Sequence, residues 1–404
     1  MLILRDCTWL HAPPFRSRPP SRVRCSKVPM ATSIRIAIVG DVHNDWNLEE
    51  DTKALQLLKP DLVLFTGRCT GDFGNENVDI VRSISNLDFA TAVILGNHDA
   101  WKTRKFAPKY HLMTFLSHTF LSILVFPMNE ESFHLPVLEQ FPVGTILLRK
   151  EKDSIFALPL SVEKDAVQLQ LEYLGEAHVG YRRLDFPNFK LSIVGGRPFS
   201  CGGDYMFRNK LLAARYSVHK MDESAKRIYQ AALTTPTDHS VIFLAHNGPT
   251  GLGSNVDDIC GRDWVPEGGD HGDPDLAVAI SQLKATTKQS IKLVVFGHMH
   301  KELAYGKGVR KMIVVGDDST VYLNGAIVPR VKTISNEQVS HISSSNTEMT
   351  SAIASDFKGT LRAFTIADIV DGNLEKVTET WVLVIKDIVK IENKVVLFNK
   401  AAKM

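Results

Sequence analysis

The sequence predicts an α/β layered fold. Short apolar runs, which are typical of buried strands, alternate with stretches of helical periodicity along most of the chain. Such an alternation implies strands that are buried on both faces. Strands are predicted at Ile34–Val39, Leu62–Thr66, Ala92–Leu95, Lys190–Val194, Val241–Ala245, Lys292–Phe296, Lys311–Val315 and Thr320–Val328.

The helices between these strands follow from a repeat of apolar residues every three to four positions. One of them has a clear start signal, because Asp273 precedes Pro274 and its side chain can cap the helix. Helices are predicted at Leu48–Leu58, Val78–Leu87, Gln168–Leu174, Glu223–Leu233 and Leu276–Leu283.

Composition indicates a soluble globular protein with a sizeable core. The 404 residues are 44% hydrophobic and 23% charged, with a net charge of +2. The positive charge is concentrated in the first 30 residues, so the rest of the chain is net acidic and shows no nucleic-acid-binding signature. The longest apolar block, Phe115–Met128, contains Pro127 and is too short to span a bilayer.

The N-terminal 30 residues are rich in Arg, Ser and Pro and poor in acidic residues, which favours a transit peptide to the chloroplast. Alternatives are a mitochondrial destination, a disordered tail, or a cytosolic form that starts at Met30. Five scattered cysteines without CxxC spacing argue against a disulfide framework or a zinc ribbon. The sequence does not indicate an oligomeric state.

Polar side chains follow five of the predicted strands directly or within a few residues. The motifs are Gly40-Asp41-Val42-His43, Gly71-Asp72-Phe73-Gly74-Asn75, Gly96-Asn97-His98-Asp99, His246-Asn247-Gly248 and Gly297-His298-Met299-His300. In open α/β sheets, ligand sites gather beyond the carboxyl ends of the strands. Each motif alone is more often a turn than a site, but their joint occurrence at strand ends favours one polar cluster.

The mixture of imidazole, carboxylate and amide oxygen suits two divalent transition metals such as Mn, Fe or Zn. Two neighbouring metals can activate a water and hold a phosphoryl group for displacement. The Gly-rich segments Gly195-Gly196-Arg197-Pro198 and Gly202-Gly203 either line a substrate cleft or serve as plain connections.

The five motifs, in this order, resemble the calcineurin-like metallophosphoesterases. The resemblance covers roughly residues 34–330 and implies a β-sandwich flanked by helices, with a dinuclear metal site at the strand ends. It implies that one metal binds Asp41, His43 and His300, that the other binds Asn97, His246 and His298, and that Asp72 bridges them. His98 resembles the residue that protonates the leaving oxygen, with Asp99 orienting it.

The resemblance also narrows the activity. The protein Ser/Thr phosphatase branch carries GDxVDRG and GNHE, whereas this chain reads GDFGNEN and GNHD. We therefore expect a phosphomonoesterase or phosphodiesterase that acts on a small phosphorylated substrate. The alternative is a non-catalytic scaffold, or a form impaired by two insertions.

The first insertion delays Asp72 by four residues relative to an uninterrupted Thr-Gly-Asp junction, which the repeated Thr66-Gly67 and Thr70-Gly71 make visible. The second is an irregular stretch at about 110–160, which is either a lid, a disordered insertion or translated intron. We expect a phosphoesterase domain at 31–385 and a tail at 386–404. Leu361–Ile369 and Thr378–Ile385 are predicted as edge strands that complete the second sheet.

Overall fold

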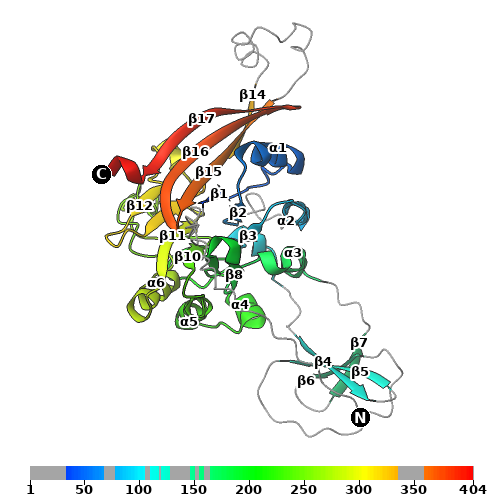
Figure 1. Ribbon diagram of the computed structural model, residues 1–404. Helices are drawn as coiled ribbons and strands as arrows, with labels where there is room; N and C mark the ends of the chain where they lie inside the picture. The colour runs from blue at the N-terminus through cyan, green and yellow to red at the C-terminus, as the bar shows by residue number, and fades with distance from the viewer. Residues whose placement is uncertain are drawn as a thin grey trace, which may run out of the picture. The chain divides into compact units, whose positions relative to one another are not determined.

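Two sheets of the computed structural model pack face to face, and helices cover their outer sides (Figure 1). The structure describes residues 33–67, 78–104, 164–334 and 359–403, together with the backbone of four strands between residues 110 and 158. The basic N-terminal segment, for which a transit peptide is predicted, lies outside these residues. The mixed α/β prediction is confirmed.

The first sheet has seven strands in the order β17-β16-β15-β1-β2-β3, with β14 paired to β15. Strands β1, β2 and β3 run parallel to one another, and β15 pairs antiparallel with β1. The bounds are β1 (Ser33–Val39), β2 (Leu62–Phe65), β3 (Thr91–Val93), β14 (Val331–Ile334), β15 (Gly359–Val370), β16 (Asn373–Ile385) and β17 (Ile388–Asn399).

The second sheet has six strands in the order β12-β13-β11-β10-β9-β8, and its four strands β13, β11, β10 and β9 are parallel. The residues that follow β1, β3, β10 and β11 contact one another, so the carboxyl ends of the parallel strands of both sheets meet in a common region. The bounds are β8 (Arg183–Phe186), β9 (Leu191–Gly195), β10 (Ser240–Leu244), β11 (Ser290–Phe296), β12 (Ile313–Val315) and β13 (Val321–Asn324).

Six α-helices and several short 3-10 turns connect the described strands. The α-helices are α1 (Leu48–Leu58), α2 (Val78–Ser85), α3 (Ala166–Leu174), α4 (Asn209–Tyr216), α5 (Met221–Leu233) and α6 (Pro274–Thr286). The 3-10 turns are η1 (Asn97–Ala100), η2 (Gly175–Ala177), η3 (Pro187–Phe189), η4 (Ala304–Gly306) and η5 (Lys400–Lys403).

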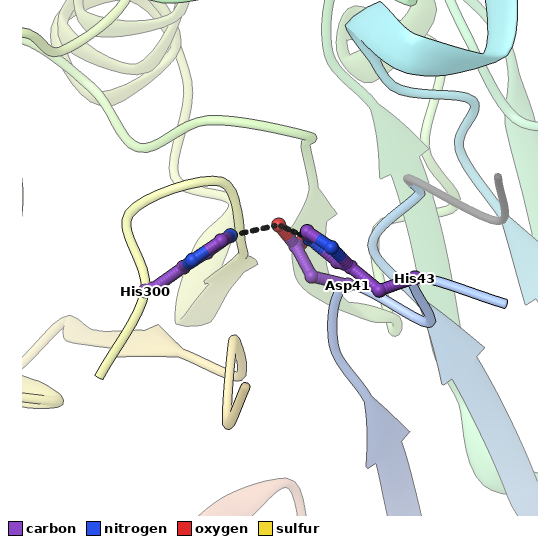
Figure 2. Close-up of side chains that lie close together, drawn as sticks. All are labelled: Asp41, His43 and His300. Atoms are coloured by element: carbon purple, nitrogen blue, oxygen red, sulfur yellow. Dashed lines mark ion pairs between the residues drawn. The ribbon is translucent and has the colours of Figure 1, made fainter. Parts of the chain in front are cut away.

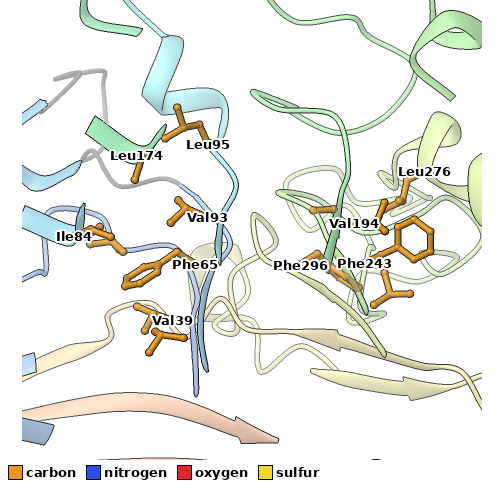
Figure 3. Packing of buried hydrophobic residues seen from close by; sticks show 14 of the residues in the cluster. Val39, Phe65, Ile84, Val93, Leu95, Leu174, Val194, Phe243, Leu276 and Phe296 are labelled. Atoms are coloured by element: carbon orange, nitrogen blue, oxygen red, sulfur yellow. The ribbon is translucent and has the colours of Figure 1, made fainter. Parts of the chain in front are cut away.

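The core is divided by the sheets into an inner layer and outer layers. Alternate residues of one strand point to opposite sides, so Ile36 and Ile38 of β1 face the second sheet while Val39 faces the helices. Figure 3 shows the outer layers, where Phe65 packs beside Ile84 of α2 and Phe243 beside Leu276 of α6. Burial of both strand faces is confirmed for the central strands β2, β9 and β10, whereas β12 and β17 are half-buried or exposed along most of their length.

Helix α6 begins at Pro274, directly after the predicted cap position and two residues before the predicted range, but Asp273 does not cap it with its side chain. Its carboxylate instead accepts hydrogen bonds from Arg197 and Ser200. The expected cap is wrong because a buried guanidinium from a distant segment competes for the same oxygen.

The C-terminal strands differ from the prediction. Strands β15 and β16 lie inside the first sheet, where β15 pairs with β1, and are not edge strands of the second. The expected tail at 386–404 contains β17, which forms the edge and pairs with β16 along its length. Irregular pairing between Val377 and Thr378 and between Trp381 and Val382 interrupts the register of β16 and β17. Such interruptions weaken the alternation that marks a strand in a sequence.

The stretch at about 110–160 was expected to be irregular, but it contains the four strands of a third sheet in the order β4-β5-β6-β7. Its runs of Phe, Leu, Ile and Val have the composition of strands. The bounds are β4 (Tyr110–Ser117), β5 (Phe120–Pro127), β6 (Ile146–Lys150) and β7 (Ser154–Leu158). The connections around these strands, including 128–145, lie outside the described residues. No helix in the described part of the chain is long and apolar enough to cross a membrane.

Candidate metal centre

Asp41, His43 and His300 come together from the ends of β1 and β11 (Figure 2). Asp41 Oδ2 lies 3.8 Å from His43 Nε2 and 3.7 Å from His300 Nε2. One ligand atom from each of the three residues lies within 4.8 Å of the other two. Asp41 is fully buried, so its charge points at the two imidazoles rather than at solvent.

The loops that carry these residues are bent into the left-handed region of backbone space. Asp41 has φ 31°, His43 φ 49°, Asn44 φ 66° and His298 φ 67°. Each such residue costs about 1–3 kcal/mol and persists only where the surroundings enforce it. Gly297 completes the arrangement, because a Cβ there would lie 2.2 Å from Asp41 Oδ1. Close approach of the two loops therefore depends on glycine.

A second group consists of Asn97 after β3, His246 after β10 and His298 after β11. Asn97 Oδ1 lies 3.0 Å from His246 Nε2, and the rings of His246 and His298 are 5.0 Å apart. The His298 backbone N–H donates to Asp41 Oδ1 at 3.0 Å, which ties the second group to the first.

His246 is already oriented as a metal ligand. Its Nδ1 lies 2.7 Å from the carbonyl oxygen of Thr66, and its Nε2 faces the Asn97 carbonyl oxygen. A neutral imidazole carries one N–H and cannot donate to both oxygens. With Nδ1–H on Thr66, Nε2 and Asn97 Oδ1 are two acceptors that a cation would hold together.

His98 and Asp99 lie on the 3-10 turn η1 with Asn97. His98 is nearly buried, and its ring centroid lies 6.3 Å from that of His43. Asp99 Oδ2 accepts the Gly96 N–H at 2.7 Å, and the Asp99 carbonyl accepts from Gln170. These bonds fix the turn that presents Asn97 and His98 to the cluster.

Two further residues, Thr66 and His271, contribute to the site and are not among the predicted site residues. Thr66 lies at the end of β2, and its hydroxyl is 3.4 Å from Asp41 Oδ1. His271 stacks on His298 with ring centroids 5.9 Å apart and lies 2.7 Å from the Cys201 carbonyl. Thr66 could have been found from its position at a strand end. His271 could have been found because it is a histidine within a loop rich in Gly and Asp.

Six of the seven predicted ligands are described and form the two groups of three. The seventh, Asp72, and the inserted residues 68–71 lie outside the described residues, so the bridging role of Asp72 stays a prediction.

The donor set fits divalent transition metals. Imidazole, carboxylate and amide oxygen are ligands that Mn, Fe and Zn accept. Cys201 is the one cysteine among the described residues that line the adjoining cleft, and it lies outside both ligand groups. Burial raises the pKa of its thiol to about 11. The residues present fit an oxygen- and nitrogen-ligated site.

A cleft of about 540 Å³ adjoins the metal centre. Asn97, His298 and His300 are among its lining residues, and the loop after β9 contributes Cys201 and Tyr205. The sequence left open whether the Gly-rich segments line a cleft or serve as plain connections. For the loop around Gly202-Gly203 the first role is supported, because its neighbours Cys201 and Tyr205 line the cleft. Burial lowers the pKa of His271, which also lines the cleft.

The calcineurin-like phosphoesterase family matches residues 34–302 of this chain. The chain therefore belongs to this family, as the order of its strand-end motifs predicted. The family implies hydrolysis of phosphate esters with divalent metals. No curated protein matches the chain closely enough to count as a relative.

Among solved structures, the chain is similar to GAP50, the anchor in the inner membrane complex of Plasmodium, with 10% identity, a TM-score of 0.34, and coverage of 91% of this chain and 90% of that one. It is also similar to a hypothetical protein from Thermus thermophilus, with 11% identity, a TM-score of 0.35, and coverage of 89% of this chain and 100% of that one. A third similar structure is a novel phosphatase from Mycoplasma pneumoniae, with 10% identity, a TM-score of 0.33, and coverage of 88% of this chain and 95% of that one. Such low TM-scores carry no conclusion about this chain.

Proposed function

We propose that this protein is a two-metal phosphoesterase of the GNHD type that hydrolyses a small phosphate ester. The observation that carries the proposal is the convergence of Asp41, His43 and His300 within 4.8 Å beside the linked group of Asn97, His246 and His298. Asp72 is proposed to complete the set as a bridge. Mn, Fe and Zn all suit these ligands.

When bound, the metals would lower the pKa of a water and offset the charge of a phosphoryl group. The chain's own residues hold the surrounding geometry. Asp41 is fixed by the His298 N–H on one oxygen, which leaves the other oxygen directed at His43 and His300. His246 is held in one tautomer by the Thr66 carbonyl.

His98 is proposed as the general acid. It lies one residue from Asn97, on a turn fixed by Asp99, and its side chain is nearly buried beside the cluster. Histidine titrates near neutral pH, so it can give a proton to a leaving oxygen and regain it from water. The carboxylate of Asp99 positions this turn through the Gly96 N–H.

The proposal also includes a chloroplast destination, supported only by the basic N-terminal composition. Import of the full-length chain fused to a fluorescent protein, compared with a chain that starts at Met30, checks this part separately.

The activity is tested with the full chain, Mn²⁺ and p-nitrophenyl phosphate. We expect hydrolysis that a chelator stops, and about two equivalents of metal per chain by elemental analysis. Asp41→Ala and His300→Ala should each reduce the rate by about 100-fold or more, because outer-shell changes alone cost about 10–100-fold at metal sites. The exposed His219 provides a control, since His219→Ala removes a histidine that lies outside both ligand groups.

Two results would contradict the proposal. Unchanged activity in Asp41→Ala and His300→Ala would remove these residues from the site. A correctly folded chain that binds no metal would favour the scaffold alternative.

A further inference from the structure

Two rows of aromatic rings lead from the proposed metal ligands to exposed rings that line the adjoining cleft. The first ring row runs from His43 through His98, Trp101 and Phe207 to Tyr205, with successive centroids 6.3, 5.2, 5.2 and 6.5 Å apart. Trp101 and Phe207 are stacked, with an angle of 27° between their planes.

The second ring row runs from His246 through His298 and His271 to Trp264. Successive ring centroids are 5.0, 5.9 and 4.8 Å apart. Members of both rows line the same cleft, namely Trp101, Tyr205, Phe207, Trp264, His271 and His298. Aromatic side chains therefore line the cleft in two continuous rows that start at the proposed metal ligands.

The outer rings are left open to solvent. Trp101 is 42% exposed, Trp264 46% and Tyr205 66%. A folded chain gains nothing from exposing large flat apolar groups together, and such a surface next to a reactive centre is typical of a binding site. The rings offer faces for stacking rather than a closed apolar cavity.

An arginine ties the outer end of the second row to a ligand segment. Arg310 is buried and donates to the carbonyls of His300 at 2.9 Å and Gly261 at 2.7 Å. It also pairs with Asp263 at 3.0 Å, the residue before Trp264. The position of Trp264 is thus coupled to the backbone of a proposed metal ligand.

In the first ring row, Arg208 holds Trp101 and Phe207 in a similar way. Arg208 Nε donates to the Ala100 carbonyl at 2.7 Å, directly before Trp101, and its guanidinium lies 4.9 Å from the Phe207 ring. Both walls are therefore held in place before a ligand arrives, which lowers the entropic cost of binding.

We infer that this cleft binds the planar aromatic part of the phosphate ester whose phosphoryl group the metal centre holds. The inference rests on the proposed function and names its substrate class: monophosphate esters of a nucleoside or of an aryl alcohol. Arg310 is the one Lys or Arg in the described lining, and it is committed to Asp263 and to carbonyls. The exposed Glu302 adds a negative charge, so the cleft does not suit a di- or triphosphate chain.

The test compares esters that share a phosphate and differ in the ring. AMP and ribose 5-phosphate differ only by the base, and phenyl phosphate carries an aryl ring without a sugar. With the Mn²⁺-loaded full chain, we expect kcat/KM to be higher for AMP or phenyl phosphate than for ribose 5-phosphate. A preference for AMP over ribose 5-phosphate supports the nucleoside class. Phenyl phosphate also has the better leaving group, so the aryl class is supported only if its advantage depends on Trp264.

Trp264→Ala should reduce the ratio of kcat/KM for the preferred aromatic ester to that for ribose 5-phosphate by about 10-fold, because stacking of one base on one aromatic ring is worth about that much. Trp264→Phe should recover most of the ratio, since a ring face remains. Tyr305→Ala is the matched control, because Tyr305 is 81% exposed and does not line the cleft. An unchanged ratio in Trp264→Ala would overturn the inference.

A binding measurement separates this inference from the proposed function. AMP should quench tryptophan fluorescence of the full chain more than ribose 5-phosphate or inorganic phosphate does, and Trp264→Ala should reduce the quench. If no ester is hydrolysed, the proposed function fails while the quench still decides the aromatic cleft. Hydrolysis of all three esters with no aromatic preference and no quench would refute the aromatic cleft alone.

Discussion

Two buried arginine–carboxylate networks stand behind the two halves of the site, and they differ in charge balance. The Asp51 network pairs Arg330 and Arg362 with Asp51 at 2.6 and 2.7 Å, and Arg362 also binds Glu50. The Arg197 network pairs one guanidinium with Asp273 at 2.9 Å and Asp275 at 3.0 Å. The first has two cations for two carboxylates, and the second has one cation for two.

Each network supports a different part of the site. Arg330 donates to the carbonyl of Asp45, which follows the Asp41–His43 loop. Arg197 donates to the carbonyl of Tyr205 at 3.1 Å, which fixes the loop that lines the cleft. The balanced network thus holds ligand geometry, and the network with excess negative charge holds the substrate side.

Burial of the Arg197 network shifts the titration of Asp273. Burial, with a further contribution from the nearby Asp275 carboxylate, raises the pKa of Asp273 to about 7, although Arg197 opposes this shift. The network with one cation for two carboxylates therefore contains a carboxyl group whose pKa lies near neutral pH. Its stability should therefore depend on conditions under which the catalytic cluster would work.

The largest expected effect comes from removing Arg197. Arg197→Met leaves two buried carboxylates without their cation and should lower the free energy of unfolding by about 3–5 kcal/mol. Arg330→Met should lower it by about 1–3 kcal/mol, because Asp51 keeps its bond to Arg362. Urea unfolding of both variants measures the difference. Equal losses would show that charge balance does not distinguish the networks.

The next effect is a pH dependence set by Asp273. Its pKa is about 7 in the folded chain and 3.8 as the ordinary value, so between these values the folded state binds the extra proton. The stability from this group is full below about pH 4 and is lost as pH rises through about 7. Asp273→Asn should remove this contribution, whose slope is at most about 1.4 kcal/mol per pH unit.

Ser200→Ala provides the matched test in the other direction. The Ser200 hydroxyl donates to Asp273 Oδ1 at 2.6 Å and lowers the pKa of Asp273. Without it, the pH midpoint of the stability loss should move upward. Unfolding free energies measured between about pH 5 and 8 check both variants. A wild-type profile that shows no loss in this range would contradict the assignment of the proton to Asp273.

The strands, most helices and the ligand motifs could be predicted from the sequence because each of these carries a local pattern. Helix α1 has the predicted bounds, and His246 and His298 lie beside each other as the strand ends implied. The networks have no such pattern, since Asp51 lies 279 residues from Arg330 and Asp273 lies 76 residues from Arg197. Asp273 even carried a false local signal, because a residue before a helix-starting proline is a common cap.

The ring rows were missed for the same reason. Trp101, Phe207 and Trp264 come from three loops, and loop residues carry no periodicity that would place them on a common wall. Only the pairing of strand ends by the fold brings these segments to one cleft.

The smallest expected effect on stability concerns the insertion at Arg68–Gly71, on the side of the site that the Asp51 network supports. Thr66 at the end of β2 meets Asp41 at 3.4 Å, so an uninterrupted Thr-Gly-Asp junction would place a carboxylate one residue after Gly67. Deleting Arg68, Cys69, Thr70 and Gly71 creates that junction with Asp72. Closing a loop shorter by four residues changes chain entropy little, so the free energy of unfolding should stay within about 1 kcal/mol.

Metal affinity should respond much more than stability does. A bridging carboxylate offsets the repulsion between two cations, and misplacing it weakens their binding. We expect the deletion variant to bind Mn²⁺ about 10-fold more tightly, a typical effect of ligand positioning, and to hydrolyse p-nitrophenyl phosphate faster. Asp72→Asn in the deletion background is the control, and it should abolish the gain because an amide cannot bridge as a carboxylate does. Equal metal affinity in the full chain and the deletion variant would show that the four residues do not disturb the junction. The Asp72→Asn variant would then be the one remaining test of whether Asp72 bridges the metals.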